Sequence, residues 1–280
     1  MSVLAEGRKL QILSELEREG KVMVVPLARQ FDVSTETIRR DLQVLENEGH
    51  LRRVYGGAVK SSFRSDEAPY NLRQKMYAAE KRAIGECAAR LIKDGGTIVI
   101  DGGTTTLEMA QAITGRRGLT ILTSSLPLAA CLLEALNREQ FSGKVIMLGG
   151  EVSPRQHSIT GILGERMMRG FSIDQAFISV GGISWAQGFT DFDLSEASMS
   201  CAFAEAAQEV IVLADHSKFG INTFAPIMPI EKCDYIVSDQ VPSLQWQEHL
   251  RKRKVEWIAA SVDNSRSFAI LNSREESSDV

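Results

Sequence analysis

Residues 33–46 read VSTETIRRDLQVLE, and this stretch decides the fold of the N-terminal part of the 280-residue chain. Ile38, Leu42 and Leu45 follow the i, i+4, i+7 spacing of one face of an α-helix. Ser34 precedes them at a position where its hydroxyl can cap the first helical turn. The apolar face predicts packing against other helices, so the opposite face is expected to be polar and exposed.

Two shorter apolar repeats lie upstream of this helix. The repeat within residues 10–16 predicts a first helix from about residue 5 to residue 19, which Gly20 ends. Pro26 suits the first position of a short second helix, and Val33 then lies in the turn. Helices joined in this way predict a helix-turn-helix whose last helix enters the major groove of DNA.

Residues 50–60, HLRRVYGGAVK, alternate in polarity around a Gly pair, which predicts a β-hairpin. Residues 49–60 hold three basic side chains and no acidic one, so the hairpin resembles a wing that reaches phosphates or the minor groove. A solvated charged helix beside an ordinary hairpin is the alternative for each feature taken singly. The side chains expected to contact DNA are Ser34, Thr35, Glu36, Thr37, Arg39, Arg40, Arg52, Arg53 and Tyr55.

The composition is that of a soluble globular protein, with 44% hydrophobic and 24% charged residues. The net charge of −4 argues weakly against nucleic-acid binding, although the local distribution of charge matters more. The sequence has no apolar run long enough for a membrane span and no secretory signal, so a cytoplasmic protein is expected. The four cysteines are widely spaced, and we expect no metal and no cofactor.

Beyond residue 69 strand-like runs alternate with helical ones. The strand-like runs are residues 97–100, 119–122, 144–148, 176–180, 210–213 and 235–237. This alternation predicts a mostly parallel, doubly wound α/β domain. The expected organisation is a winged helix-turn-helix at 1–60, a linker at 61–75, the α/β domain at 76–262 and a loose tail at 263–280.

The first strand of this domain is followed by Asp101-Gly102-Gly103-Thr104-Thr105-Thr106 and then a helix. Glycines allow a tight turn, and the amides at the helix N-terminus together with the hydroxyls can bind a phosphate. The stretch is neither a Walker A loop nor GxGxxG, which disfavours a nucleotide. An ordinary strand-to-helix turn is the alternative.

Ligands collect at the carboxyl ends of the strands in such a sheet, so the residues that follow each strand are the candidates for ligand contact. Lys218 is a candidate to neutralise a phosphate, and Asp101, Asp193, Glu196 or Asp215 to accept sugar hydroxyls. A helix-capping acid is the alternative for Glu196, and a surface lysine for Lys218. The expected ligand-binding residues are Asp101, Gly102, Gly103, Thr104, Thr105, Thr106, Ser124, Ser125, Gly149, Gly150, Gly181, Gly182, Asp193, Glu196 and Lys218.

Both halves of the chain resemble the DeoR family of bacterial regulators. VSTETIRRDLQVLE and LRRVYGGA match its helix-turn-helix and wing, and DGGTTT, GFTD and ADHSKFG match its sensor domain. The resemblance implies a sensor fold similar to that of ribose-5-phosphate isomerase. It also implies a phosphorylated-sugar effector and control of sugar catabolism, often by repression that the effector relieves. TSS at 123–125 stands where many members have Thr-Asn-Ser, and the loss of that side-chain amide is expected to change which sugar hydroxyl is contacted there.

A DNA-binding regulator and an aldose–ketose sugar-phosphate isomerase with an accessory helical domain are the two main hypotheses. An isomerase needs a base such as Glu196 or Asp101, but it has no use for a recognition helix and a basic wing. A purely structural interaction module leaves the phosphate-type loop unexplained. We therefore expect a regulator, not an enzyme, with double-stranded operator DNA as partner and a homodimer or homotetramer as the assembly.

Overall fold

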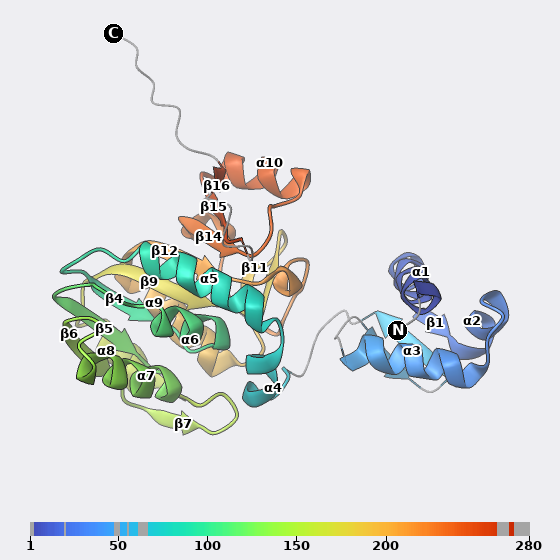
Figure 1. Ribbon diagram of the computed structural model, residues 1–280, viewed down its shortest axis with the longest axis horizontal. Coiled ribbons are helices and arrows are strands. Elements are labelled where there is room, and N and C mark those ends of the chain that lie inside the picture. Colours follow the sequence, from blue (N-terminus) through green and yellow to red (C-terminus); the bar gives the residue numbers. More distant parts are fainter. Residues whose placement is uncertain are drawn as a thin grey trace, which may run out of the picture. The chain divides into compact units, whose positions relative to one another are not determined.

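The computed structural model describes residues 3–19, 21–47, 51–54, 56–60, 67–261 and 269–271. The chain divides into two compact units, Met1–Arg64 and Ser65–Val280 (Figure 1). Each unit has its own hydrophobic core, and the second unit has one core on each face of its central sheet.

The first unit is a winged helix-turn-helix. Its elements are α1 (Val3–Glu19), β1 (Lys21–Met23), α2 (Val24–Gln30), α3 (Thr35–Asn47), β2 (Leu51–Val54) and β3 (Gly57–Lys60). The stripe of Ile38, Leu42 and Leu45 is at most 2% exposed and packs against Ile12 of α1 and Leu27 of α2. Strands β2 and β3 form the predicted antiparallel hairpin, with Val54 paired to Gly57.

Two details of the first unit differ from the sequence expectation. Strand β1 was not predicted, because three residues are too short for a periodic pattern; it pairs with β3 to give the order β1-β3-β2. Helix α2 begins at Val24, so Pro26 is its third residue rather than its first. The first turn of a helix has no intrahelical acceptor for its N–H groups, so a proline fits there as well.

The second unit contains an eight-stranded sheet in the order β16-β15-β14-β12-β9-β4-β5-β6, parallel except for β16. Its strands are β4 (Thr97–Ile100), β5 (Leu119–Thr123), β6 (Gly143–Met147), β9 (Ile173–Ser179), β12 (Ala207–Leu213), β14 (Tyr235–Ser238), β15 (Glu256–Ala259) and β16 (Ala269–Leu271). The six predicted strand-like runs all belong to this sheet. The doubly wound α/β fold is therefore confirmed.

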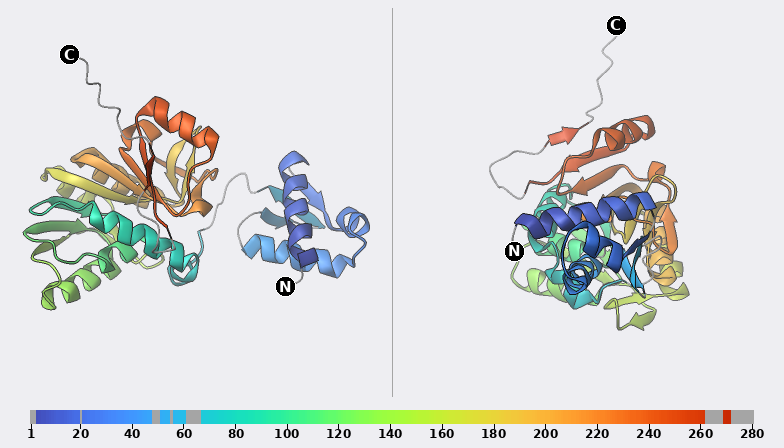
Figure 2. Two further views of the ribbon diagram at one scale, coloured as in Figure 1. Left: turned by 45° about the horizontal axis from the view of Figure 1, so that its top comes forward. Right: turned by 90° about the vertical axis from the view of Figure 1, so that its right-hand side faces the viewer.

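Helices cover both faces of this sheet (Figure 2). One face packs against α5 (Ala78–Arg90), α6 (Thr104–Gln111) and α7 (Leu126–Asn137). The other packs against α8 (Ile162–Met168), α9 (Leu194–Ala206) and α10 (Leu244–Arg253). Strands buried on both faces are apolar throughout, as the run Ile98-Val99-Ile100 shows, with every residue 0% exposed.

Smaller elements complete the unit. They are α4 (Tyr70–Lys75), the hairpin β7 (Glu151–Ser153) with β8 (Ser158–Thr160), the sheet of β10 (Gly182–Ser184), β11 (Gly188–Asp191) and β13 (Ala225–Met228), and the short 3₁₀ helices η1 (His216–Lys218) and η2 (Ile230–Lys232). Among the described residues, no helix is both long enough and apolar enough to cross a membrane.

Two of the predicted boundaries need correction. Residues 67–75 belong to the second unit rather than to a linker, because α4 buries Tyr70 and the side chains of Glu67 and Arg73 pair. Within the predicted tail, Ala269–Leu271 forms β16, which adds an antiparallel edge strand to β15. An apolar triplet can satisfy the open hydrogen bonds of an edge strand without any longer pattern.

Candidate functional site

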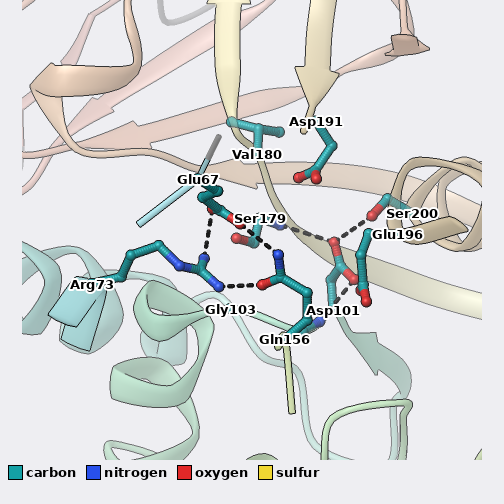
Figure 3. A pocket seen from close by; sticks show the side chains of 11 residues that line it. Glu67, Arg73, Asp101, Gly103, Gln156, Ser179, Val180, Asp191, Glu196 and Ser200 are labelled. Carbon is teal, nitrogen blue, oxygen red and sulfur yellow. Dashed lines mark hydrogen bonds and ion pairs between the residues drawn. The ribbon is translucent and has the colours of Figure 1, made fainter. Parts of the chain in front are cut away.

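A polar pocket lies where the sheet changes winding direction, between β4 and β9. The Asp101 amide, just after β4, donates to the Phe177 carbonyl of β9 over 3.0 Å. The pocket is lined by Glu67, Arg73, Asp101, Gly102, Gly103, Gln156, Ser179, Val180, Asp191, Glu196 and Ser200 (Figure 3). Strands on either side of such a point send their connections to opposite faces, which leaves a crevice for a ligand.

Asp101 is the buried centre of this pocket, with 3% of its surface exposed. Its carboxyl group accepts hydrogen bonds from the Gly102 amide at 2.7 Å, the Ser179 amide at 3.3 Å and the Ser200 hydroxyl at 2.7 Å. Burial nevertheless raises the pKa of Asp101 to about 8, because removal from water penalises the charged form. Near neutral pH this group therefore exists largely as a neutral carboxyl.

Two more carboxyl groups face Asp101. Glu196 lies in the first turn of α9, which Asp193 caps by accepting from the amides of Ser195 and Glu196. The Ser158 hydroxyl donates to Glu196 Oε1 over 2.5 Å. Burial raises the pKa of Glu196 to about 7 and that of Asp191 to about 6. The pocket can therefore both donate hydrogen bonds to a polyol and accept them from it.

The turn between β4 and α6 requires glycine for a steric reason. A Cβ atom on Gly103 would lie 2.3 Å from Ser179 Oγ, so only glycine lets α6 start this close to β9. Gly102 has more room, since the nearest atoms to its Cβ position lie 3.7–4.0 Å away. Thr106 uses its hydroxyl internally, donating to the Gly103 carbonyl over 3.1 Å. The threonines Thr104 and Thr105 are buried in the same turn.

Of the predicted ligand-binding residues, the pocket brings together Asp101, Gly102, Gly103 and Glu196. The other predicted residues do not line it. Ser125 caps α7 by accepting from the Leu128 amide, although its Cβ lies 3.8 Å from the Cβ position of Gly102. The carbonyl of Ser124 accepts from the Ile159 amide.

The two predicted Gly-Gly turns have a packing role. A Cβ on Gly150 would lie 2.3 Å from the Thr160 carbonyl oxygen, and one on Gly182 would lie 2.5 Å from that of Ile221. A Cβ on Gly181 would meet the Phe192 ring at 2.9 Å, whereas at Gly149 the nearest atom is Met167 Sδ at 3.8 Å. Gly150, Gly181 and Gly182 therefore permit close approach of neighbouring segments, whereas Gly149 has room for a side chain. None of the four lines the pocket.

Sequence reasoning missed one side of the pocket entirely. Glu67 and Arg73 lie in the stretch predicted as linker, and Gln156 lies between β7 and β8. Arg73 Nη1 pairs with Glu67 Oε1 at 2.8 Å, and Gln156 Nε2 donates to Glu67 Oε2 over 2.7 Å. No local motif marks these residues, because the three meet only through the tertiary fold. Ser179 and Ser200 were missed for the same reason.

Basic side chains lie next to this acidic pocket. Lys81 of α5 is 5% exposed and donates from Nζ to the Arg73 carbonyl over 2.5 Å. Burial lowers the pKa of Lys81 to about 8, and Asp215, Lys218 and Arg73 act on it electrostatically. Lys218 and Arg73 both favour the charged form of Asp191 and partly offset its burial. Lys218 thus lies in the electrostatic environment of the pocket.

The exposed face of α3 is a separate candidate site. The Ser34 hydroxyl accepts from the Thr37 amide over 3.1 Å, so the predicted N-cap is present. The side chains of Glu36, Arg39 and Arg40 are 61%, 58% and 81% exposed. Glu36 lies 3.5 Å from Arg39 and 3.9 Å from Arg40, and exposed pairs of this kind are weak enough for a ligand to replace.

Helix α3 is fixed from both sides. Asp41 forms an ion pair with Arg8 of α1, with Nε and Oδ2 2.5 Å apart and both side chains at most 14% exposed. The Arg53 amide of the wing donates to Glu46 Oε1 over 2.7 Å, and its guanidinium donates to Gln43. Tyr55 and the side chain of Arg52 lie outside the described residues.

Comparison with known proteins places both units in one family. The DeoR-like helix-turn-helix domain matches residues 8–62, and the DeoR C terminal sensor domain matches residues 76–240. The chain belongs to the DeoR family. A DeoR-family relative, the HTH-type transcriptional regulator GolR of Listeria innocua, is 33% identical over 83% of this chain and 89% of its own. The putative aga operon transcriptional repressor of Escherichia coli O157:H7 is 32% identical over 90% of this chain and 92% of its own.

DeoR-family membership decides between the two main hypotheses. The protein is a DNA-binding transcriptional regulator and not an enzyme, because its relatives along nearly the full length are regulators. Ribose 5-phosphate isomerase A from Neisseria gonorrhoeae aligns with 51% of this chain and 53% of its own, at a TM-score of 0.36 and 15% identity. That similarity is too low to carry an inference about a ligand.

Proposed function

We propose that this DeoR-family protein is a repressor of sugar-metabolism genes that releases its operator when a phosphorylated sugar binds the pocket around Asp101. The observation that carries the proposal is the chemistry of this pocket at the winding switch of the sheet. It combines carboxyl groups of raised pKa with the N-terminus of α6 and with nearby cations.

The carboxyl groups suit the sugar end of such an effector. Asp101 and Glu196 are held by Ser200 and Ser158, so their remaining lone pairs and protons keep fixed directions toward the pocket. Sugar hydroxyl groups both donate and accept hydrogen bonds, and they match a mixed set of neutral and ionised carboxyls. Burial strengthens each of these bonds because little water competes for them.

Positively charged groups in and near the pocket suit the phosphate end of the effector. The amides of the first α6 turn carry the positive end of the helix dipole next to Gly102 and Gly103, which line the pocket. Arg73 lines the pocket directly, and Lys81 and Lys218 lie near it. Thr104 and Thr105 stay candidates for contact with the phosphate because they begin this turn.

Repression is proposed because several DeoR-family relatives are named repressors. One is the transcriptional repressor AccR of Agrobacterium fabrum, 34% identical over 84% of this chain and 89% of its own. The exposed arginines of α3 supply base contacts in this proposal, and the wing supplies phosphate contacts. A single winged helix covers too few base pairs for useful specificity, so a homodimer or homotetramer is proposed as well.

The test is a thermal-shift screen of the full chain against ribose 5-phosphate, glucose 6-phosphate, fructose 6-phosphate and tagatose 6-phosphate, each paired with its unphosphorylated sugar. An operator selected from random DNA would then be titrated with any compound that stabilises the protein. We expect stabilisation by a phosphorylated sugar only, together with loss of operator binding. Equal stabilisation by the free sugar, or an unchanged operator affinity, would contradict the proposal.

A further inference from the structure

One wall of the pocket is made by residues that neither family domain includes. Glu67 and Arg73 lie between the helix-turn-helix match, which ends at residue 62, and the sensor match, which begins at residue 76. Their side chains are only 10% and 14% exposed. Tyr70 holds the intervening segment in place, since it is 4% exposed and its ring stacks on His157 with centroids 4.7 Å apart.

Glu67, Arg73 and Gln156 form a closed ring of polar contacts (Figure 3). Arg73 donates to Glu67 and to Gln156 Oε1, while Gln156 Nε2 donates to the second oxygen of Glu67. Figure 3 shows this ring on one side of the pocket and Asp101, Glu196 and Ser200 on the other. The segment that precedes α5 is thereby joined to the β7–β8 connection.

The ring leaves one strong donor of the guanidinium unused. Arg73 Nε is buried and has no hydrogen-bond partner among the described residues. An unsatisfied buried donor on a charged group is costly, and an additional acceptor would remove that cost. A phosphate group offers three acceptor oxygens in a geometry that a guanidinium can meet with two parallel bonds.

The pocket has too little space for such a group while the ring is closed. The cavity volume is about 20 Å³, which is the space of a single water molecule and not of a phosphate. An entering anion must therefore displace one of the side chains around it. Glu67 is the side chain that an entering anion replaces, because it is the carboxylate paired with Arg73 at 2.8 Å. It is also one of four carboxyl groups in the lining, and its negative charge opposes ionisation of both Asp191 and Glu196.

The geometry points to Arg73 as an anion-binding residue of the pocket. The Glu67 carboxylate of the same chain competes with the anion for the Arg73 guanidinium. A phosphate group takes the place of the Glu67 carboxylate on Arg73, and the ring with Gln156 opens. The inference rests on the proposed function and adds to it a phosphate partner and a means of regulation. Glu67 is joined through residues 61–66 to the winged helix, so ligand binding acts directly on the segment that carries the DNA-binding unit.

Inorganic phosphate is the probe for the test, titrated by calorimetry into the full chain with sodium chloride at matched ionic strength as the blank. Glu67→Gln keeps the shape of the competitor and removes its charge. We expect it to bind phosphate about tenfold more tightly than the wild type, the ratio typical for loss of one charged hydrogen bond. We expect Arg73→Gln to bind about tenfold more weakly for the same reason.

The matched control is Glu134→Gln, which removes an exposed Glu134–Arg138 pair of 3.1 Å from the surface of α7. It should bind phosphate as the wild type does. Hydrogen exchange supplies a second readout, because the amides of Leu72 and Arg73 donate to the Pro69 carbonyl at 2.9 and 3.0 Å. Phosphate should speed exchange at both amides in the wild type, since the segment loosens when Glu67 is displaced.

The outcomes separate this inference from the proposed function. A sugar phosphate that binds the wild type and Arg73→Gln equally overturns the role of Arg73 and leaves the proposed function in place. Equal phosphate affinity of Glu67→Gln and wild type overturns the competitor role, even where Arg73→Gln is too unstable to measure. Failure of every phosphorylated compound to bind both the wild type and Glu67→Gln overturns the inference and the proposed function together.

Discussion

The Ser200 hydroxyl donates a 2.7 Å hydrogen bond to Asp101 Oδ2 and so joins α9 to the turn that follows β4. The two residues are 99 positions apart in the chain, and both are at most 3% exposed. This bond aligns the carboxyl group that stands between the two halves of the sheet. It also ties the position of Glu196, four residues earlier on α9, to that of Asp101.

The raised pKa values predict a pH-dependent stability of the second unit. A carboxyl group with a higher pKa in the folded state takes up a proton on folding, so its stabilising effect is full at low pH and is lost as pH rises from about 4 toward the folded value. The folded values are about 8 for Asp101 and about 7 for Glu196. The free energy of unfolding should therefore fall between about pH 5 and pH 8.

Tryptophan fluorescence during denaturant unfolding measures this effect selectively, because all three tryptophans lie in the second unit. Asp101→Asn should reduce the fall by about 1 kcal/mol or more, the free energy of one pKa unit. Glu134→Gln, on an exposed pair, should leave it unchanged. A pH profile of Asp101→Asn that matches the wild type would contradict the raised pKa of this group.

Gly103→Ala should destabilise the second unit by about 1–3 kcal/mol through overpacking. The added Cβ would lie 2.3 Å from Ser179 Oγ and 2.7 Å from Ser179 Cβ. Ser179→Gly removes both atoms and should restore stability in the double variant. Gly102→Ala, whose Cβ would meet nothing closer than 3.7 Å, is the control in the same turn. Equal losses of stability in Gly102→Ala and Gly103→Ala would show that backbone flexibility, and not close approach to Ser179, explains why this turn contains glycine.

Arg8→Met should destabilise the first unit by about 3 kcal/mol, because it leaves the Asp41 carboxylate buried without its partner. Hydrogen exchange of the α3 amides is the measurement, since the first unit contains no tryptophan. The double variant Arg8→Met, Asp41→Leu should recover much of the loss, because it removes both charges of the buried pair. Additive losses in the double variant would argue against this ion pair.

Arg40→Ala should weaken binding to the selected operator by about 1–3 kcal/mol and affect random DNA less, because an exposed α3 arginine can reach base edges. Arg53→Ala should weaken both DNAs, since it removes the contact to Gln43 that holds the wing against α3. Fluorescence anisotropy over a range of salt concentrations measures both effects. Equal losses on operator and random DNA in Arg40→Ala would remove its proposed role in base reading.

The sequence alone determined the two-part organisation, because each element of it has a local signature. The spacing of Ile38, Leu42 and Leu45 specifies a buried helix face, and Ser34 caps that helix through bonds within one turn. The apolar strand-like runs between residues 97 and 237 alternate with helical segments and predict a parallel sheet covered on two faces. Such a sheet places its ligand crevice at the carboxyl ends of its strands.

Only the tertiary structure decided which polar residues meet in that crevice. Asp101 and Ser200 are far apart in the chain, and so are Arg73 and Gln156, so no periodicity or motif relates the members of either pair. Strand order also decided that Gly182 serves close packing while Gly103 lines the pocket. Local pattern reports the preferences of neighbouring residues, whereas a binding site depends on long-range contacts that form only when the sheet is assembled in one order.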